Sequence, residues 1–532
     1  TLNGGNLSAA TVSGATTVNG TGNATIANAN TVSSTALTGD LNVASNSGAV
    51  NIGDVSGTAT FGDAQADVTA TGTLGALDAT LNGGNLSAAT VSGATTVNGT
   101  GNATIASANT VSSTALTGDL NVASNSGAVN IGDVSGTATF GDAQADVTAT
   151  GTLGALDATL NGGNLSAATV SGATTVNGTG NATIASANTV SSTALTGDLT
   201  IGSATGDTNV GTVSGKLSVS NSAGNVTVTG SVGTAELKNV QDVDINSATV
   251  TDIDGANNVN IGSTGSLGVQ NAASLSVATT GNVVVSDMTG DVSFDNINGT
   301  LDAQRIGGEV KVTDTVTGNA LVDTAGSVDI ANANSDVTAK NIAGDVKIDN
   351  VAGAATLEKI GGNVTSATSL GSLDASNVTG SITAKDVAGK IKARGIADIS
   401  AETAASLDID GAGNVDVSTV NGTTNVANAT GLDIVSANGN VRADAINGDI
   451  NLGTVDGKVD LSRATGGAVS VGSVNGNFTA EESESSITVD TVSGNMKLTD
   501  VSDVAVTGKI DGKLTANGAG DISAETVEGT SN

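Results

Sequence analysis

The sequence predicts an all-β chain that folds as a right-handed parallel β-solenoid (β-helix) built from units of about nine residues. Three observations support this prediction: a long tandem repeat, a shorter repeat inside it, and a composition with no proline, cysteine, histidine, tryptophan or tyrosine. Self-similarity at a fixed period is the sequence signature of folds in which each unit packs only on its neighbours.

The long repeat has a period of 79 residues. Residues 1–79 recur as residues 80–158 with a single substitution, Asn28 to Ser107, and a third copy runs from Thr159 to Leu199. Near-identical tandem copies indicate recent duplication and tolerance of length change, which suits a spacer or lattice element better than an active site. We therefore divide the chain into a near-identical array, 1–199, and a diverged continuation of the same solenoid, 200–532.

The short repeat has the pattern Gly-x-Φ-x-Φ-x-x-Φ-x, where Φ is an apolar residue. It persists in the diverged part, for example at Gly380–Ala388, Gly389–Ala397, Gly448–Asp456 and Gly494–Ser502. Two apolar residues two positions apart predict a short strand with one buried face. The two-residue gap before the third apolar residue predicts a turn, after which Gly permits the tight backbone that begins the next side.

The number of units in one turn is open between two and three. Two units would give about 18 residues per turn and a flattened two-sheet coil, whereas three would give about 27 and a triangular coil. The 79-residue block contains nine units, eight of nine residues and one of seven. Because nine divides evenly by three, three units per turn are slightly preferred.

The composition predicts the kind of core. The absence of proline leaves every strand its ladder donors, and the absence of cysteine excludes disulfides and zinc–thiolate sites. Only four aromatic residues are present, Phe61, Phe140, Phe294 and Phe478. We therefore expect a narrow core of Val, Ile, Leu and Ala.

The chain is strongly acidic, with 17 basic residues, 51 acidic residues and a formal net charge of −34. Residues 1–199 contain 11 Asp and no Lys or Arg. A polyanion without basic patches or stacking aromatic residues is a poor nucleic-acid binder, and no stretch approaches the 18 or so apolar residues of a membrane span. Such a chain suits divalent cations and high solubility. Because residue 1 is Thr and lies inside a repeat, we expect a mature product or an excerpt of a longer protein.

Two pairs of carboxylates are candidate calcium ligands: Asp252 with Asp254, and Asp408 with Asp410. Each pair is followed by Gly, and Asp-x-Asp-Gly at a turn offers oxygen ligands to Ca²⁺. The alternative is simple alternation, in which both carboxylates face solvent because the Ile between them faces inward. A third acidic cluster is Glu481, Glu482 and Glu484, and the tandem glycine-rich calcium signature of β-roll proteins is absent.

The sequence argues against an enzyme. Paired carboxylates hydrolyse polysaccharides in some β-helix enzymes, but such sites add basic or aromatic groups that this chain almost lacks, and the regular repeat leaves no long loops for a cleft. Asn residues near the expected turns, such as Asn6, Asn19 and Asn23, predict stacked amide ladders along the solenoid. Threonine pairs such as Thr58 and Thr60 suggest an ice-binding face, but the threonine ranks do not persist.

The chain resembles bacterial surface-layer proteins and filamentous-haemagglutinin-type β-helix adhesins. The resemblance lies in a composition rich in Thr, Ser, Ala, Gly, Asn and Val, in the absence of cysteine, and in repeats such as Gly439–Asn447. This resemblance covers the whole chain in texture and period. It implies an extracellular location on the bacterial cell surface and a structural or adhesive role without catalytic residues.

Together these features predict an extracellular structural protein that forms a fibre, surface layer or biofilm-matrix scaffold by self-association, head to tail or laterally. The main alternative is the monomeric stalk of a large cell-surface adhesin. A carbohydrate-binding matrix module that contacts surface polysaccharide and an ice-binding solenoid are further alternatives.

Overall fold

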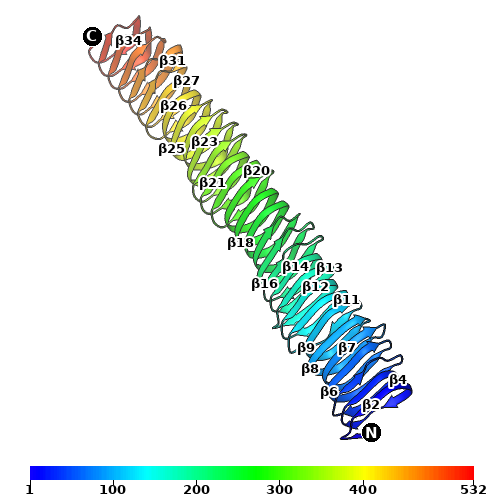
Figure 1. The fold of residues 1–532 in the computed structure, drawn as a ribbon. Coiled ribbons are helices and arrows are strands. Elements are labelled where there is room, and N and C mark those ends of the chain that lie inside the picture. The colour runs from blue at the N-terminus through cyan, green and yellow to red at the C-terminus, as the bar shows by residue number, and fades with distance from the viewer. The chain divides into compact units, whose positions relative to one another are not determined.

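The computed structural model describes residues 1–532 and contains 37 β-strands and no helix. The strands pair in parallel and stack as turns of a β-solenoid, about 29 turns in all (Figure 1). The predicted all-β solenoid is therefore confirmed, whereas its handedness and the nine-residue unit stay predictions. The chain divides into two compact units, Thr1–Thr264 and Gly265–Asn532. The boundary at residue 199 marks where the near-identity of the copies ends and is a boundary of sequence only.

The first unit contains long strands of 11 to 15 residues and a few short strands of two or three residues. They are β1 (Leu2–Asn3), β2 (Leu7–Thr17), β3 (Gly20–Thr21), β4 (Ala24–Leu37), β5 (Leu41–Val43), β6 (Val50–Ala64), β7 (Val68–Asn82), β8 (Leu86–Thr100), β9 (Ala103–Leu116), β10 (Leu120–Val122), β11 (Val129–Ala143), β12 (Val147–Asn161), β13 (Leu165–Thr179), β14 (Ala182–Leu195), β15 (Leu199–Ile201), β16 (Thr208–Ser220) and β17 (Val226–Lys238). The long strand β18 (Val243–Met288) contains the boundary between the two units.

The second unit continues with strands of the same kind. They are β19 (Val292–Ile297), β20 (Leu301–Val316), β21 (Ala320–Ala333), β22 (Val337–Ile342), β23 (Val346–Ile360), β24 (Val364–Val378), β25 (Ile382–Ile396), β26 (Ile399–Val420), β27 (Thr424–Ala437), β28 (Val441–Asp444), β29 (Asn447–Val455), β30 (Val459–Ser462), β31 (Thr465–Val474), β32 (Phe478–Ser483), β33 (Ile487–Val492), β34 (Met496–Val501), β35 (Val504–Ile510), β36 (Leu514–Asn517) and β37 (Ile522–Val527).

The strand register gives the length of a turn. Val50 of β6 pairs with Val68 of β7, and Val68 pairs with Leu86 of β8, so the chain returns to the same place after 18 residues. A neighbouring turn is one residue shorter, from Leu86 to Ala103. The preference for three units and about 27 residues per turn is therefore wrong. The number of units in a block does not constrain the number of units in a turn, because equivalent units of successive copies need not lie on the same side of the solenoid.

The core consists of the apolar positions of the short repeat. In one turn the side chains of Val50, Ile52, Val55, Ala59 and Phe61 are all at most 2% exposed. All four Phe side chains of the molecule are buried, and the remaining core is Val, Ile, Leu and Ala with two Met, as the composition predicts. Because each turn contributes only a few such side chains, the core is narrow and every turn depends on the turns above and below it.

The second unit has a column of left-handed corner residues, one in each turn. The non-glycine members have φ from 50° to 64° and are Asn271, Asp287, Arg305, Thr324, Asn341, Lys359, Asn377, Asn428, Ala445, Arg463, Glu482 and Asp500. Gly395, Gly411 and Gly518 take the same place in three further turns. Left-handed backbone is costly for residues with a Cβ atom, most of all for a β-branched one such as Thr324. Asn, Asp and Gly suit this corner, whereas at Thr324, Arg305, Lys359, Ala445, Arg463 and Glu482 the stacked turns impose it against local preference.

Candidate functional site

Most carboxylates and many amides of the repeat array cap the backbone of the next turn. The amide N–H of Asp119 donates to Oδ1 of Asn102 at 2.8 Å, and Oδ1 of Asp119 accepts from the N–H of Thr137, also at 2.8 Å. The same ladder joins Asn6, Asn23 and Asp40 in the first copy. Asn6 and Asn23 lie on adjacent turns, but each amide oxygen accepts from a backbone N–H and not from the next side-chain amide, so these contacts are backbone caps and not the predicted amide ladder. They give the Asp residues a structural role, since they satisfy N–H groups at the corners.

The glycine that precedes many of the capping residues follows from the same geometry. A Cβ atom on Gly118 would overlap the backbone of Gly101 and lie 2.6 Å from Oδ1 of Asn102. Only glycine leaves room for the capping oxygen of the turn below. The recurrent Gly-Asp/Asn-Φ sequence is thus a packing requirement of stacked turns.

Asp63 and its copy Asp142 are the most heavily bonded carboxylates of the array. Asp63 accepts hydrogen bonds from Gln65 Nε2 at 2.8 Å, Asn82 Nδ2 at 2.8 Å and Ser45 Oγ at 3.1 Å. These donors, Gln65 first, hold the pKa of Asp63 below its ordinary value because they stabilise the charged form. Their position at a corner that repeats in the next copy indicates a structural network.

The structure places Asp252 and Asp254 on the outer surface of β18. Ile253 between them is fully buried, Asp252 is exposed and Asp254 is half-buried, which is the alternation that the alternative interpretation describes. In the preceding turn Glu236 lies in register with Asp252, and Lys238 lies in register with Asp254. Two or three carboxylates fall short of the six to eight oxygen ligands that Ca²⁺ takes, so protein carbonyls and water would have to complete the site.

Asp408 and Asp410 of β26 are paired with cations. Oδ2 of Asp408 lies 2.6 Å from Nζ of Lys390 and 3.8 Å from Nη2 of Arg394, and Oδ2 of Asp410 lies 3.5 Å from Nη1 of Arg394. The Lys390 hydrogen bond holds the pKa of Asp408 below its ordinary value. A calcium ion would have to displace these side chains, so the residues present fit ion pairs better than a metal.

The same two carboxylates line a groove of about 350 Å³ on this surface. Asn425 and Ala427 form its floor, because they occupy the turn between Asp408 and Asp410 on one side and Arg442 and Asp444 on the other. The groove therefore carries both signs of charge. This groove could not be predicted from the sequence, because no sequence motif marks a turn whose short side chains lie between turns with longer side chains.

The acidic cluster of β32 is divided by the structure. Glu481 lies 2.7 Å from Nζ of Lys497 in the next turn, and Glu482 occupies the left-handed corner with φ of 52°. Nowhere in the chain do three or more His, Cys, Asp or Glu side chains gather closely enough to hold a metal ion. Calcium binding stays a prediction.

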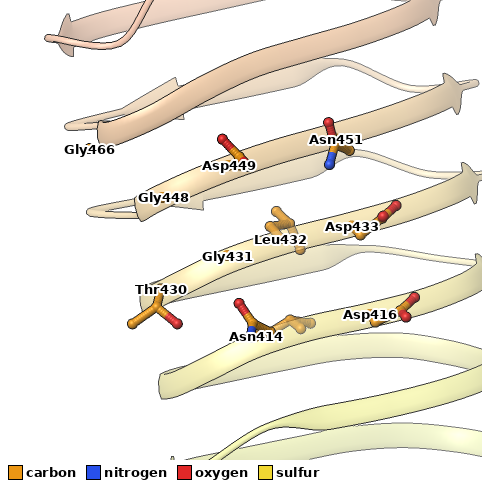
Figure 2. Close-up of a pocket in the computed structure, with 11 residues that line it drawn as sticks. Asn414, Asp416, Thr430, Gly431, Leu432, Asp433, Gly448, Asp449, Asn451 and Gly466 are labelled. Carbon is orange, nitrogen blue, oxygen red and sulfur yellow. The ribbon is translucent and has the colours of Figure 1, made fainter.

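A larger groove of about 480 Å³ lies on the surface of β26, β27, β29 and β31 (Figure 2). It exists because Gly431, Gly448 and Gly466 leave the strand edges without side chains. Figure 2 shows Asp416, Asp433 and Asn451 on three successive strands, where the register pairs each with the next. None of the lining side chains is basic, so the groove offers only carboxylate, amide and hydroxyl groups to a ligand.

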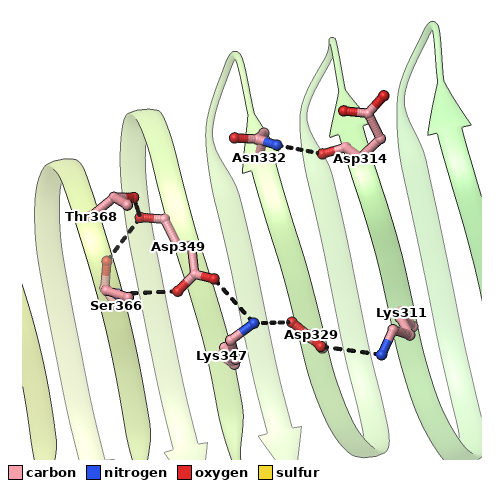
Figure 3. Close-up of polar contacts among 9 residues, drawn as sticks. Lys311, Asp314, Asp329, Asn332, Lys347, Asp349, Ser366 and Thr368 are labelled. Atoms are coloured by element: carbon pink, nitrogen blue, oxygen red, sulfur yellow. Dashed lines mark hydrogen bonds and ion pairs between the residues drawn. The ribbon is translucent and has the colours of Figure 1, made fainter.

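In one part of the second unit, opposite charges alternate along consecutive turns. Asp329 lies between Lys311, with Nζ at 3.4 Å, and Lys347, with Nζ at 3.1 Å, and Lys347 also contacts Asp349 at 3.0 Å (Figure 3). These hydrogen bonds, that of Asp349 first, raise the pKa of Lys347 above its ordinary value. The ladder neutralises the surface of consecutive turns and fixes their register.

No family model, curated protein or solved structure matches the chain. The structure contains no helix that could cross a membrane.

Proposed function

We propose that the chain is an extracellular structural protein of the bacterial cell surface that forms a fibre, surface layer or biofilm-matrix scaffold by self-association. The observation that carries this proposal is the way in which the near-identical copies stack. Val50 and its equivalent Val129 each pair in parallel with residues one turn before and one turn after, in the same register. Adding a copy therefore adds turns without changing the core or the corners.

The distribution of polar groups supports a structural and non-catalytic role. Many carboxylates and amides of the array cap the backbone at the corners, and most basic residues of the second unit pair with acidic ones on adjacent turns. These side chains hold the solenoid together. In such a structural role, the number of turns and the surface that they present are the properties that matter.

Calcium is proposed as a bridging ion between acidic surfaces of neighbouring copies, since carboxylates from two chains can together supply the oxygen ligands that one chain lacks. Asp252 and Asp254 face outward from β18 and are the carboxylates that we propose bridge neighbouring copies.

Sedimentation velocity and negative-stain electron microscopy of the purified chain, with Ca²⁺ and then with a chelator, test this proposal. Fibres or sheets are expected in Ca²⁺. If chelator dissolves these assemblies, and if an Asp252→Asn, Asp254→Asn variant does not form them in Ca²⁺, the bridging is assigned to these carboxylates. Single chains under both conditions would contradict self-association.

The groove at Asp416, Asp433 and Asn451 favours one second candidate, the stalk of an adhesin whose surface also contacts polysaccharide. Hydroxyl-rich ligands are recognised by carboxylate and amide groups in shallow clefts. Glycan-array binding by the wild-type chain, lost in an Asp416→Ala, Asp433→Ala variant, would favour this candidate over a scaffold.

A further inference from the structure

Two ranks of outward side chains run along residues 8–227 of the first unit, one on each of its two strand columns, and the next turn continues them with Glu236 and Asp244. The first rank passes in register from Ser33 through Asn51 and Asn121 to Thr227. The second rank passes from Ser8 through Asn42 and Asn130 to Ser218. Every member is exposed or half-buried.

The ranks are almost uncharged, although the unit is strongly acidic. The first rank consists of Ser, Thr and Asn with one exception, Asp157, and the second consists of the same types with one exception, Asp78. Of the remaining Asp residues of the array, Asp63 and Asp142 bind neighbouring side chains, and the other seven accept hydrogen bonds from backbone N–H groups of the next turn. Two copies of a polyanion repel each other, so these ranks are the surfaces on which a second copy can approach most closely.

The repeat places equivalent residues on opposite sides of the solenoid. Asp78 and Asp157 are 79 residues apart and occupy the same position of their copies, yet Asp78 belongs to the second rank and Asp157 to the first. The same holds for Asn42 and Asn121. One 79-residue block thus contains an odd number of half-turns, and each successive copy presents the same surface on the other side.

We propose that the two ranks are lateral contact surfaces for further copies of this chain and that the half-turn offset makes the array two-sided. This inference rests on the proposed self-association and specifies its geometry. Hydroxyl and amide groups both donate and accept hydrogen bonds, so one rank complements another. Within the ranks such contacts already form, as between Thr96 and Ser112 at 3.1 Å. Stacked parallel sheets with Thr and Asn ladders pack face to face in the same way. Because both sides are alike, each chain contacts two neighbours and builds sheets.

Isosteric charge substitutions test the proposal. Asn42→Asp with Asn130→Asp places two carboxylates on the second rank only, and we expect association to stop at pairs of chains joined through the first rank. The matched variant Asn42→Asp with Asn121→Asp carries the same two charges, one on each side, and we expect single chains. Both effects should disappear at a pH low enough to protonate the new carboxyl groups.

Sedimentation velocity and electron microscopy give the readout, and circular dichroism confirms that each variant keeps its strand content. If either Asp variant unfolds, Thr60→Glu with Thr148→Glu, and Thr60→Glu with Thr139→Glu, repeat the comparison. Sheets that persist in both variants would overturn the lateral contact. Wild-type filaments one chain wide would overturn it while leaving the proposed self-association intact, and single wild-type chains at all concentrations would overturn both.

Discussion

At the residue scale, the corner glycines are fixed by the side chain of the turn below. Gly118 faces Oδ1 of Asn102 and the backbone of Gly101. We predict that Gly118→Ala lowers the free energy of unfolding by about 1–3 kcal/mol, because a Cβ atom at this place must displace a capping oxygen. Gly14→Ala is the matched control, since nothing lies within 4 Å of its Cβ position. Urea unfolding of both variants checks this, and equal losses would contradict it.

Thr324 is the most strained of the left-handed corner residues by its chemistry, being β-branched with φ of 64°. We predict that Thr324→Gly raises the stability by about 1 kcal/mol, because glycine adopts this backbone without a Cβ clash. Thr338→Gly, at an outward position within β22, is expected to lower it by about 0.5–1 kcal/mol. The denaturant midpoints of both variants are measured by urea unfolding. If they shift in the same direction, the proposed backbone strain at Thr324 is refuted.

Asp444 links stability to pH. Burial raises the pKa of its carboxyl, but Arg463, with Nε at 2.9 Å and Nη2 at 2.5 Å, and the Ser462 hydroxyl outweigh burial and leave the pKa below its ordinary value. An aspartate whose pKa is lower in the folded state stabilises the protein above about pH 4, and this stabilisation is lost as the pH falls through the folded pKa. Unfolding of Asp444→Asn measured between about pH 6 and pH 2 should show a shallower acid limb than wild type. Identical slopes would exclude this role.

Residue types predicted the core better than the surface. The burial of Val, Ile, Leu, Ala and the four Phe followed from the apolar pattern alone. The left-handed corners at Arg305, Lys359 and Glu482 could not be predicted, because no local preference of these residues favours that backbone. The partners of Asp408 and Asp410 were also hidden, since Lys390 lies one turn away and only the turn length brings it close.

At the scale of the element, the unit of construction is the turn of about 18 residues and not the single strand. The spacing of apolar residues predicted the strands, but the sequence favoured the wrong number of sides. Turn length depends on which strands lie above one another, and the repeat pattern is compatible with either choice.

Removing one whole turn tests this construction. In the register Leu120 pairs with Ala138, so deletion of Asn121–Ala138 joins Leu120 to Thr139 with the alternation intact. We predict that this variant folds and melts within a few degrees of the wild type, because neighbouring turns contribute most of the stability of each. Deletion of the shorter segment Asn121–Asp133 breaks the alternation and should lower the melting temperature or abolish cooperative unfolding. The melting temperatures of both variants are measured by circular dichroism. Equal losses of melting temperature in the two deletions would contradict the turn as the unit of construction.

At the scale of the whole molecule, duplication of a block with an odd number of half-turns extends the solenoid and alternates its surface. The sequence showed the duplication, but the alternation became visible only when the register placed Asp78 and Asp157 on opposite sides. The extracellular location, the calcium bridges and the right-handed coil stay predictions.

We propose that this chain is a scaffold that assembles through its solenoid. Cryo-electron microscopy of the purified full chain over a range of concentrations tests it most directly. We expect extended assemblies in which strands stack at about 4.8 Å along each chain and neighbouring chains are joined in a regular array. Isolated chains at every concentration, or assemblies without that spacing, would contradict it.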